Sequence, residues 1–393
     1  MEITMRLLEG DEMLETLYAL NSYSLHPSPP FQNKEEWMGI VRERKGITCF
    51  AVFEDEIPVS IAVSTPMTQN MRGNLFPATG VWGVSTAPSA RRKGYCRQTM
   101  ERLFSADRDS GKVFSNLYPF RESFYERMGY VSYPLTKIAR LSTQCLAPLL
   151  NMNLGGNLKV QYISEAYETY REYLTAMRLT RHGMAFFDFG DRGRANQNLL
   201  WTALAEFNGN IEGLMLFRIL GEEVTKYNFA AYRFYYRSSR ARYLLLSWIA
   251  RHIDQADRAE IWLSVDEFPE TWLADIQVKL ESPVRAAMSR LLNVEKAGGM
   301  QVGEGSFSAR IIDPLCPWNE GCWRFESCNG KLDISKTIHA ECELSIQGLS
   351  AMIAGSHDIQ DIPLRGWGNP DEGLQSIQRS MFPKIIPTMH ENF

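Results

Sequence analysis

The sequence lacks the features that mark several large classes of protein. Its seven cysteines include no C-x-x-C pair, and its six histidines stand singly without an H-E-x-x-H pattern, so the common zinc motifs are missing and we expect no metal. No apolar run approaches the roughly 18 residues of a membrane helix, and the first residues do not resemble a signal peptide. The net charge of −4 provides no basic surplus for nucleic acid or for an anionic membrane surface. We therefore expect a cytoplasmic protein without nucleic-acid or membrane partners.

Two common phosphate-binding motifs, G-x-x-x-x-G-K-[ST] and G-x-G-x-x-G, are also missing. In their place a strand-like run at residues 78–85 leads into the basic turn Pro88-Ser89-Ala90-Arg91-Arg92-Lys93-Gly94, and a helical apolar pattern follows. The first N–H groups of a helix have no partner within the helix and can donate to a diphosphate. The pattern predicts a pyrophosphate site, and the alternative is a basic helix end that only meets solvent.

A second segment, residues 113–130, predicts a short strand and then a short helix that ends at Gly129. Tyr125 lies in this helix. A tyrosine has an ordinary pKa of about 10, so at neutral pH Tyr125 keeps its proton and can act as a general acid. The alternative is a tyrosine that only fills an aromatic core.

The length of 393 residues predicts two or three domains, at roughly 100–200 residues each. Residues 1–142 predict the order β-α-α-β-β-β-α-β-α-β, in which a strand at Tyr130 to Leu141 comes last. The middle third repeats this order weakly, but no glycine occurs between Gly221 and Gly298, so we expect no second phosphate site there. From about Pro283 onward, short strands with an Asn-Gly turn precede two helices.

Two of these segments resemble the GNAT acyltransferases. The spacing Arg91-x-x-Gly94-x-Cys96 resembles their R-x-x-G-x-G/A signature, with Cys96 in place of the usual glycine or alanine, and the second segment resembles their F-Y-x-x-x-G-[FY] helix. Together with a sterol-carrier-like end, the whole chain resembles the Eis (enhanced intracellular survival) family of N-acetyltransferases. The resemblance implies an α+β (mixed α/β) chain of tandem GNAT folds and a sterol-carrier-protein-like domain, at residues 1–142, 143–285 and 286–393.

The resemblance also implies an activity and its residues. Acetyl-CoA would be the co-substrate, and a primary amine of an aminoglycoside, a polyamine or a lysine would be the acceptor in a ternary complex. Tyr125 would be the general acid and the terminal carboxylate of Phe393 the general base, in a homo-oligomer that the resemblance makes a hexamer. The residues implied for coenzyme binding are Val84, Ser85, Thr86, Arg92, Lys93, Gly94, Tyr95, Cys96, Arg97, Phe120 and Arg121.

Several points stay open at the level of sequence. The last 13 residues are apolar and contain two prolines, which favours a docked tail, yet Glu122, Glu126, Glu391 or a water molecule could replace Phe393 as the base. Trp37 and Glu391 are candidates for the acceptor pocket, and His26 stands where the family often has an acidic or aromatic residue. A covalent route through Cys96 is disfavoured. The alternative function is a ligand- or lipid-binding protein with a vestigial acetyltransferase fold.

Overall fold

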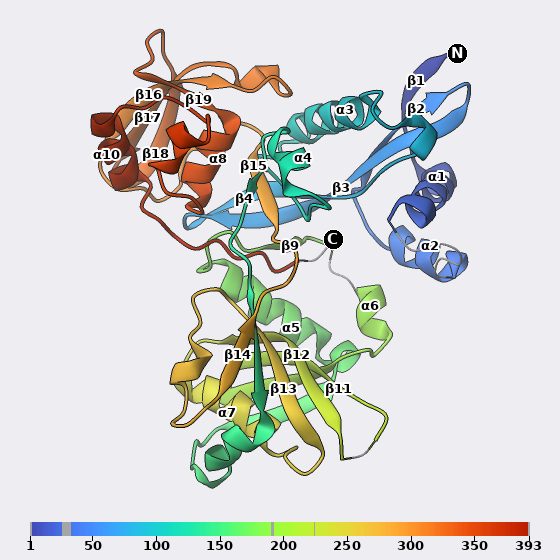
Figure 1. Cartoon of the computed structure of the whole chain (residues 1–393), viewed down its shortest axis with the longest axis vertical. Coiled ribbons are helices and arrows are strands. Elements are labelled where there is room, and N and C mark those ends of the chain that lie inside the picture. The colour runs from blue at the N-terminus through green and yellow to red at the C-terminus, as the bar shows by residue number, and fades with distance from the viewer. Residues whose placement is uncertain (1, 26–32, 190–191, 224, 392–393) are drawn as a thin grey trace. The chain divides into compact units, whose positions relative to one another are not determined.

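The computed structural model describes residues 2–25, 33–189, 192–223 and 225–391 of the chain (Figure 1). Its contacts divide the chain into two compact units. The first unit consists of Met1–Pro134, Arg178–Gly190 and Arg285–Phe393, and the second of Leu135–Met177 and Asp191–Val284. The predicted division into three domains stays a prediction, because the residues from Arg285 onward belong to the same unit as the first 134.

The first unit is built on a mixed sheet of eight strands. Neighbouring strands pair in the order β1-β2-β3-β4-β5-β15-β6, and β9 pairs with a part of β3. The pairs from β1 to β4 are antiparallel, whereas β4 and β5 are parallel. The strands are β1 Ile3–Leu7, β2 Thr48–Glu54, β3 Ile57–Met71, β4 Asn74–Thr86, β5 Phe114–Leu117, β6 Val131–Ser132, β9 Ala185–Phe187 and β15 Met288–Leu291.

Helices cover both faces of this sheet. Side chains alternate between the two faces along each strand, so a strand that is apolar throughout needs a cover on each side. On β2, Cys49 and Ala51 pack against α1 and α2, whereas Phe50 between them packs against α3. The apolar stripe predicted for α3 is confirmed, since its members at positions 99, 100, 103 and 104 are buried. The helices are α1 Gly10–Ser24, α2 Lys34–Arg42, α3 Tyr95–Asp109, α4 Glu122–Glu126 and the 3-10 turn Pro88–Ala90 (Figure 1).

The strand predicted at residues 130–141 is wrong in one respect. It splits into β6, which belongs to the first sheet, and β7 Lys137–Ser142, which pairs with β13 and β14 in the second unit. Pro134 has no N–H group with which to continue a ladder, so the strand ends there. The place beside β5 is filled instead by β15, which comes from a distant part of the sequence.

The second unit repeats the strand pattern of the first. Its sheet has the order β14-β7-β13-β12-β11-β10-β8, with antiparallel pairs from β8 to β12 and a parallel pair β12/β13. This is the pattern of β1 to β5, so the predicted tandem fold is confirmed. Its strands are β8 Asn157–Tyr162, β10 Trp201–Phe207, β11 Asn210–Leu220, β12 Tyr227–Tyr236, β13 Ala256–Leu263 and β14 Val278–Glu281. Its helices are α5 Ile163–Arg178, α6 Arg192–Asn196 and α7 Ser239–Ala250, with 3-10 turns at Thr143–Asn151 and Pro269–Thr271.

The C-terminal part of the first unit forms a four-stranded sheet, β18-β17-β16-β19, with three helices. The predicted Asn329-Gly330 turn joins β17 and β18, and both residues have the positive φ that a two-residue hairpin turn requires. Its core is continuous with the first sheet, since Phe114 and Met67 belong to the same buried cluster as Trp323. The elements are β16 Ser306–Ile312, β17 Gly321–Cys328, β18 Lys331–Lys336, β19 Cys342–Ser345, α8 Ile346–Ala354, α9 Asp361–Leu364, α10 Glu372–Met381 and the 3-10 turn Pro317–Asn319.

The tail that follows α10 is docked, as the sequence predicts. The Thr388 N–H donates to the His182 carbonyl (2.9 Å), and the Glu391 N–H donates to the Ala185 carbonyl (3.2 Å). The buried guanidinium of Arg72 donates to three main-chain carbonyls, of which two lie in α8 and one is that of Pro383 at the start of the tail. Docking therefore extends at least to Glu391.

Candidate functional site

β4 and β5 part at one end of the first sheet. Their parallel pairing covers only Ala78–Val81 and Phe114–Leu117, whereas β4 continues to Thr86 and stays paired with β3 on its other side. Pro119 follows β5 and cannot continue a ladder. The far edge of residues 82–86 thus has no strand beside it in the described part of the chain.

A bulge in β4 accompanies this parting. The register with β3 shifts between Ile61 and Val63, so that Gly83 and Val84 stand opposite one residue. Gly83 has a φ of +62°, and a Cβ there would approach Leu17 to 2.9 Å, which explains a glycine at this position. A bulge bends its strand and re-aims its backbone groups. The predicted coenzyme contacts Val84, Ser85 and Thr86 lie at or directly after this bulge.

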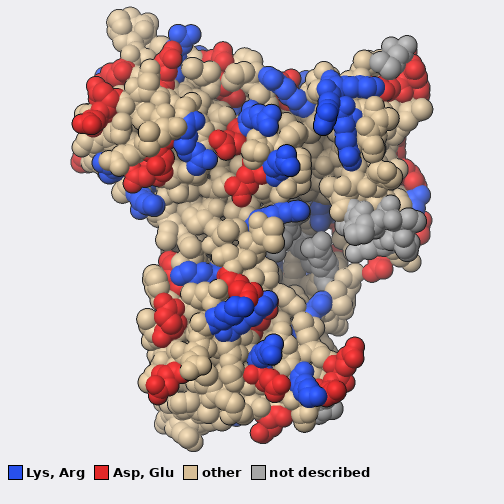
Figure 2. Space-filling model, in the orientation of Figure 1, with Lys and Arg blue, Asp and Glu red and all other residues tan. Residues whose placement is uncertain are grey.

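The basic turn after β4 ends in an open helix N-terminus. Arg92 and Gly94 both have positive φ, +67° and +87°, and the first helical hydrogen bond runs from the Gln98 N–H to the Gly94 carbonyl (3.1 Å). The N–H groups before Gln98 therefore point out of the helix. A Cβ on Gly94 would find no atom within 4 Å, so the space over the turn is open. Figure 2 shows Lys and Arg side chains gathered where α3 begins.

The side chains of this turn differ in what they offer a diphosphate. Lys93 forms an ion pair with Glu54 (Nζ to Oε1, 2.7 Å), and Tyr95 donates to the same carboxylate while its ring is buried. These two partners hold the pKa of Glu54 below its usual range. Arg97 donates to Glu101 at 2.9 Å, one helical turn on. Lys93 and Tyr95 can thus contribute chiefly their N–H groups, whereas Arg92 is exposed.

Tyr125, on α4, is buried in a cluster of aromatic side chains. Its ring stands nearly perpendicular to those of Phe124, Phe120 and Tyr130, with centroids 5.1, 5.9 and 6.0 Å away. Burial, and to a lesser degree the nearby thiol of Cys96, raises the pKa of the Tyr125 phenol above its usual range. The two predicted segments therefore meet here, because Cys96 begins α3 and Tyr125 lies on α4. Both groups are neutral at physiological pH, since burial raises the pKa of Cys96 to about 12, which argues against a covalent acetyl-cysteine route.

The structure also describes Phe120, Arg121 and Trp37, but not every predicted residue. Phe120 and Arg121 are exposed at the start of α4, and Trp37 lies on α2 with its ring 5.6 Å from that of Tyr18. Phe393 and His26 lie outside the described residues.

Each of the three alternative bases already contacts another polar group. Glu122 accepts from the Ser132 hydroxyl (2.9 Å), Glu126 lies 3.5 Å from Arg365, and Glu391 accepts from the Phe187 N–H (3.1 Å).

One buried acid on α3 was missed from the sequence. Asp107 lies on the inner side of α3 and accepts from the Ser64 hydroxyl (2.8 Å), and burial raises its pKa to about 7. A signal for it exists, because Asp107 stands four residues after Leu103 and three after Phe104, within the apolar stripe. A charged residue at such a position is a candidate for a buried group.

The corresponding helix of the second unit has a different N-terminus. The Ser238 hydroxyl caps α7 by accepting from the Ala241 N–H (3.2 Å), and it donates to Glu212 (2.6 Å). A helix end that is capped and lies beside a carboxylate disfavours a diphosphate. This supports the prediction that the second fold has no coenzyme site.

The described residues contain neither a metal-binding cluster nor a membrane-spanning helix. No group of three or more His, Cys, Asp or Glu side chains there could hold a metal ion. Within the same ranges, no helix combines the length and the apolar character needed to cross a membrane.

Comparisons with known proteins agree with this geometry. Residues 4–132 match the family model described as an acetyltransferase (GNAT) domain, and residues 294–366 match that of a sterol carrier protein domain. No curated protein matches the chain in sequence.

Solved structures share the fold over 100% of this chain and 100% of their own. They include a GCN5-related N-acetyltransferase from Anabaena variabilis (18% identity, TM-score 0.83) and a probable N-acyltransferase of unknown function from Enterococcus faecalis (18%, 0.84). A third is Eis1 from Mycobacterium abscessus (14%, 0.78). Residues 4–132 therefore form a GNAT acetyltransferase domain, residues 294–366 match a sterol carrier protein domain, and over its whole length the chain shares the fold of Eis1.

Proposed function

We propose that this protein transfers the acetyl group of acetyl-CoA to a primary amine. The observation that carries the proposal is the bulged edge of β4, which no strand among the described residues covers, beside the open N-terminus of α3, with the Tyr125 phenol buried next to Cys96. A free strand edge can bind the amide groups of a pantetheine arm, and an open helix N-terminus can bind its diphosphate. One elongated co-substrate satisfies both.

The coenzyme contacts follow from these features. Backbone groups of Val84, Ser85 and Thr86 would bind the pantetheine, although the Thr86 carbonyl already accepts from Arg91 (3.3 Å). The N–H groups from Lys93 to Arg97, with the Arg92 side chain, would bind the diphosphate. Phe120 and Arg121 would contact the coenzyme near its thioester end.

Direct transfer needs an acid and a base. The Phe393 carboxylate would take a proton from the acceptor ammonium, and the free amine would then attack the thioester carbonyl. As the carbon–sulfur bond breaks, Tyr125 would donate its proton to the departing thiolate. The raised pKa of Tyr125 keeps that proton in place until the thiolate forms. The extra proton on the attacking nitrogen would then leave to solvent or to the Tyr125 phenolate, which gives the neutral amide. Glu122, Glu126, Glu391 or a water molecule would serve if Phe393 does not.

The acceptor is proposed only by class. The net charge of −4 favours a cationic amine, and an aminoglycoside, a polyamine and a protein lysine all qualify. A cytoplasmic location and a homo-oligomer, hexameric by resemblance to the Eis family, complete the proposal.

The test is release of free thiol from acetyl-CoA across a panel of these amines. Activity with at least one amine, lost in Tyr125→Phe, would support the proposal. The alternative, a ligand- or lipid-binding protein, predicts no thiol release and no stabilisation by acetyl-CoA. A working site instead predicts about 2.7 kcal/mol of stabilisation at 100 times Kd.

A further inference from the structure

The helix that carries Tyr125 is too short to hold itself in place. α4 has five residues, whereas isolated helices below about 12–15 residues are marginal in water. Near its start, the rings of Phe124 and Tyr125 pack against other aromatic rings, and Glu122 accepts from the Ser132 hydroxyl (2.9 Å). Main-chain contacts at the end of the helix add to these in holding the Tyr125 ring.

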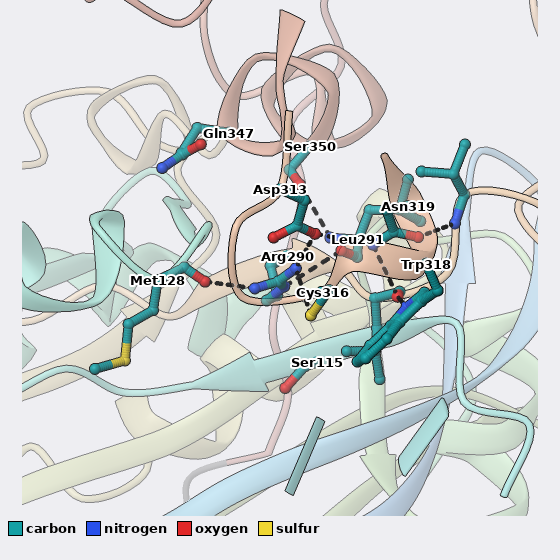
Figure 3. A network of polar contacts seen from close by, with 12 residues as sticks. Ser115, Met128, Arg290, Leu291, Asp313, Cys316, Trp318, Asn319, Gln347 and Ser350 are labelled. Carbon is teal, nitrogen blue, oxygen red and sulfur yellow. Dashed lines mark hydrogen bonds and ion pairs between the residues drawn. The ribbon is translucent and has the colours of Figure 1, made fainter. Parts of the chain in front are cut away.

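Arg290 binds that end from β15. Its side chain is fully buried, and Nη1 donates to the Met128 carbonyl (2.6 Å), directly after α4 (Figure 3). The guanidinium also lies over the ring of Phe104, 4.6 Å from its centroid. Arg290 thus ties the end of the Tyr125 helix to α3 and to a strand from the C-terminal part of the chain.

The position of Arg290 is itself fixed by that C-terminal part. Asp313 accepts from Nη2 at 2.5 Å, and Asp313 in turn accepts from Asn319 (2.9 Å). Ser350 accepts from the main-chain N–H group of Leu291, the residue after Arg290, and Asn319 accepts from that of Val294 (Figure 3). A buried charge with this many partners has few alternative positions.

Gln347 makes a second, independent contact with α4. Its Nε2 donates to the Glu126 carbonyl (2.7 Å), the residue next to Tyr125, from the first turn of α8. The ion pair of Arg365 with the Glu126 carboxylate, at 3.5 Å, is partly exposed and contributes little. The segment after α4 lies close to α8 and β15, because a Cβ on Gly129 would lie 2.8 Å from Ile346 and 2.9 Å from Arg290.

We infer that the sterol-carrier-like part of this chain serves the acetyl-transfer reaction by holding α4, with Arg290 and Gln347 as positioning residues for the Tyr125 hydroxyl. The inference rests on the proposed function, in which Tyr125 protonates the thiolate. An error of about 1 Å in such a group is enough to lower a rate by about 100-fold. This gives the C-terminal part a role that needs no lipid.

Gln347→Met is the test, because it removes the donor but keeps the length of the side chain. The Glu126 carbonyl still accepts from the Gly129 N–H (2.9 Å), so the variant should fold. We expect kcat to fall about 10-fold while KM for acetyl-CoA stays unchanged, because only one of two positioning contacts is lost. The matched control is Gln375→Met on α10, where the lost donor bonds the Pro370 carbonyl (2.9 Å) and nothing on α4.

A double variant separates positioning from general damage. If Gln347 acts through Tyr125, then Gln347→Met should cost nothing further in a Tyr125→Phe background. An equal loss in both backgrounds, or an unchanged kcat in Gln347→Met alone, would overturn the inference. If Tyr125→Phe alone keeps the wild-type rate, Tyr125 is not the general acid, and the proposed function is refuted at that point independently of Gln347. If Gln347→Met melts early, Gln347→Glu, which presents an acceptor instead of a donor, is assayed in its place.

Discussion

The carboxyl group of Asp107 should make the stability of the protein fall as the pH rises toward 7. Its side chain is 2% exposed and accepts from Ser64, while its Oδ2 atom has no hydrogen-bond partner among the described residues. Burial raises the pKa to about 7 from an ordinary value of 3.8. The folded state therefore binds this proton more tightly than the unfolded state, and the stabilisation is lost as the pH rises through 7.

The size of the effect follows from the two pKa values. A difference of about three units corresponds to about 4 kcal/mol at most, and about 2–3 kcal/mol of it falls between pH 5 and pH 8. Asp107→Asn removes the titration and keeps an acceptor oxygen for Ser64. The free-energy advantage of this variant over the wild type should therefore grow by that amount from pH 5 to pH 8.

Thermal unfolding at several pH values measures this directly. At about 2 °C per kcal/mol for a unit of this size, the gap between the midpoints of variant and wild type should widen by about 4–6 °C over this range. Asp109→Asn, an exposed acid on the same helix, is the control and should show a constant gap. A constant gap for Asp107→Asn as well would mean that its carboxylate is ionised throughout, and the burial argument would be refuted.

Three further predictions concern the proposed reaction. Tyr125→Phe should lower kcat about 100-fold or more without changing KM for acetyl-CoA, because only proton donation is lost; steady-state kinetics showing an unchanged kcat would remove Tyr125 from the mechanism. Gly94→Ala should weaken acetyl-CoA binding in calorimetry, because the φ of Gly94 is +87°. Gly111→Ala, with φ +86° and equal space at the other end of α3, should not weaken it, and equal losses would indicate general damage. Two residues added after Phe393 should abolish turnover while acetyl-CoA binding persists, since each residue moves the carboxylate by roughly 3.5 Å; an extended enzyme with the native rate would return the base role to Glu122, Glu126, Glu391 or water.

The parts of the fold that local sequence decides were predictable. The turn from Pro88 to Gly94, the Asn329-Gly330 hairpin and the buried stripe of α3 each depend on residues within a few positions of one another, and each is confirmed. The proposed site residues stay predictions, although the structure brings Cys96 and Tyr125 together.

What the sequence could not predict depends on distant partners. The sequence predicts Lys93 as a phosphate ligand, but in the folded chain its ammonium group pairs with Glu54 at the end of β2. Residues 137–142 have the alternation of a strand, but nothing local tells which sheet they join. Arg290 stands in a short apolar run, and its role depends on Asp313 and Met128, which approach only in the folded chain.

The insertion of β15 between β5 and β6 also determines when the acetyltransferase domain can be completed during synthesis. Residues 114–117 leave the ribosome with one strand edge uncovered, and their partner at Met288–Leu291 is made only after residues 135–284. Until then the chain presents an open edge of the kind that invites pairing with other chains. Although the first 142 residues contain all of the GNAT domain match, their sheet is completed only when Met288–Leu291 has been synthesised.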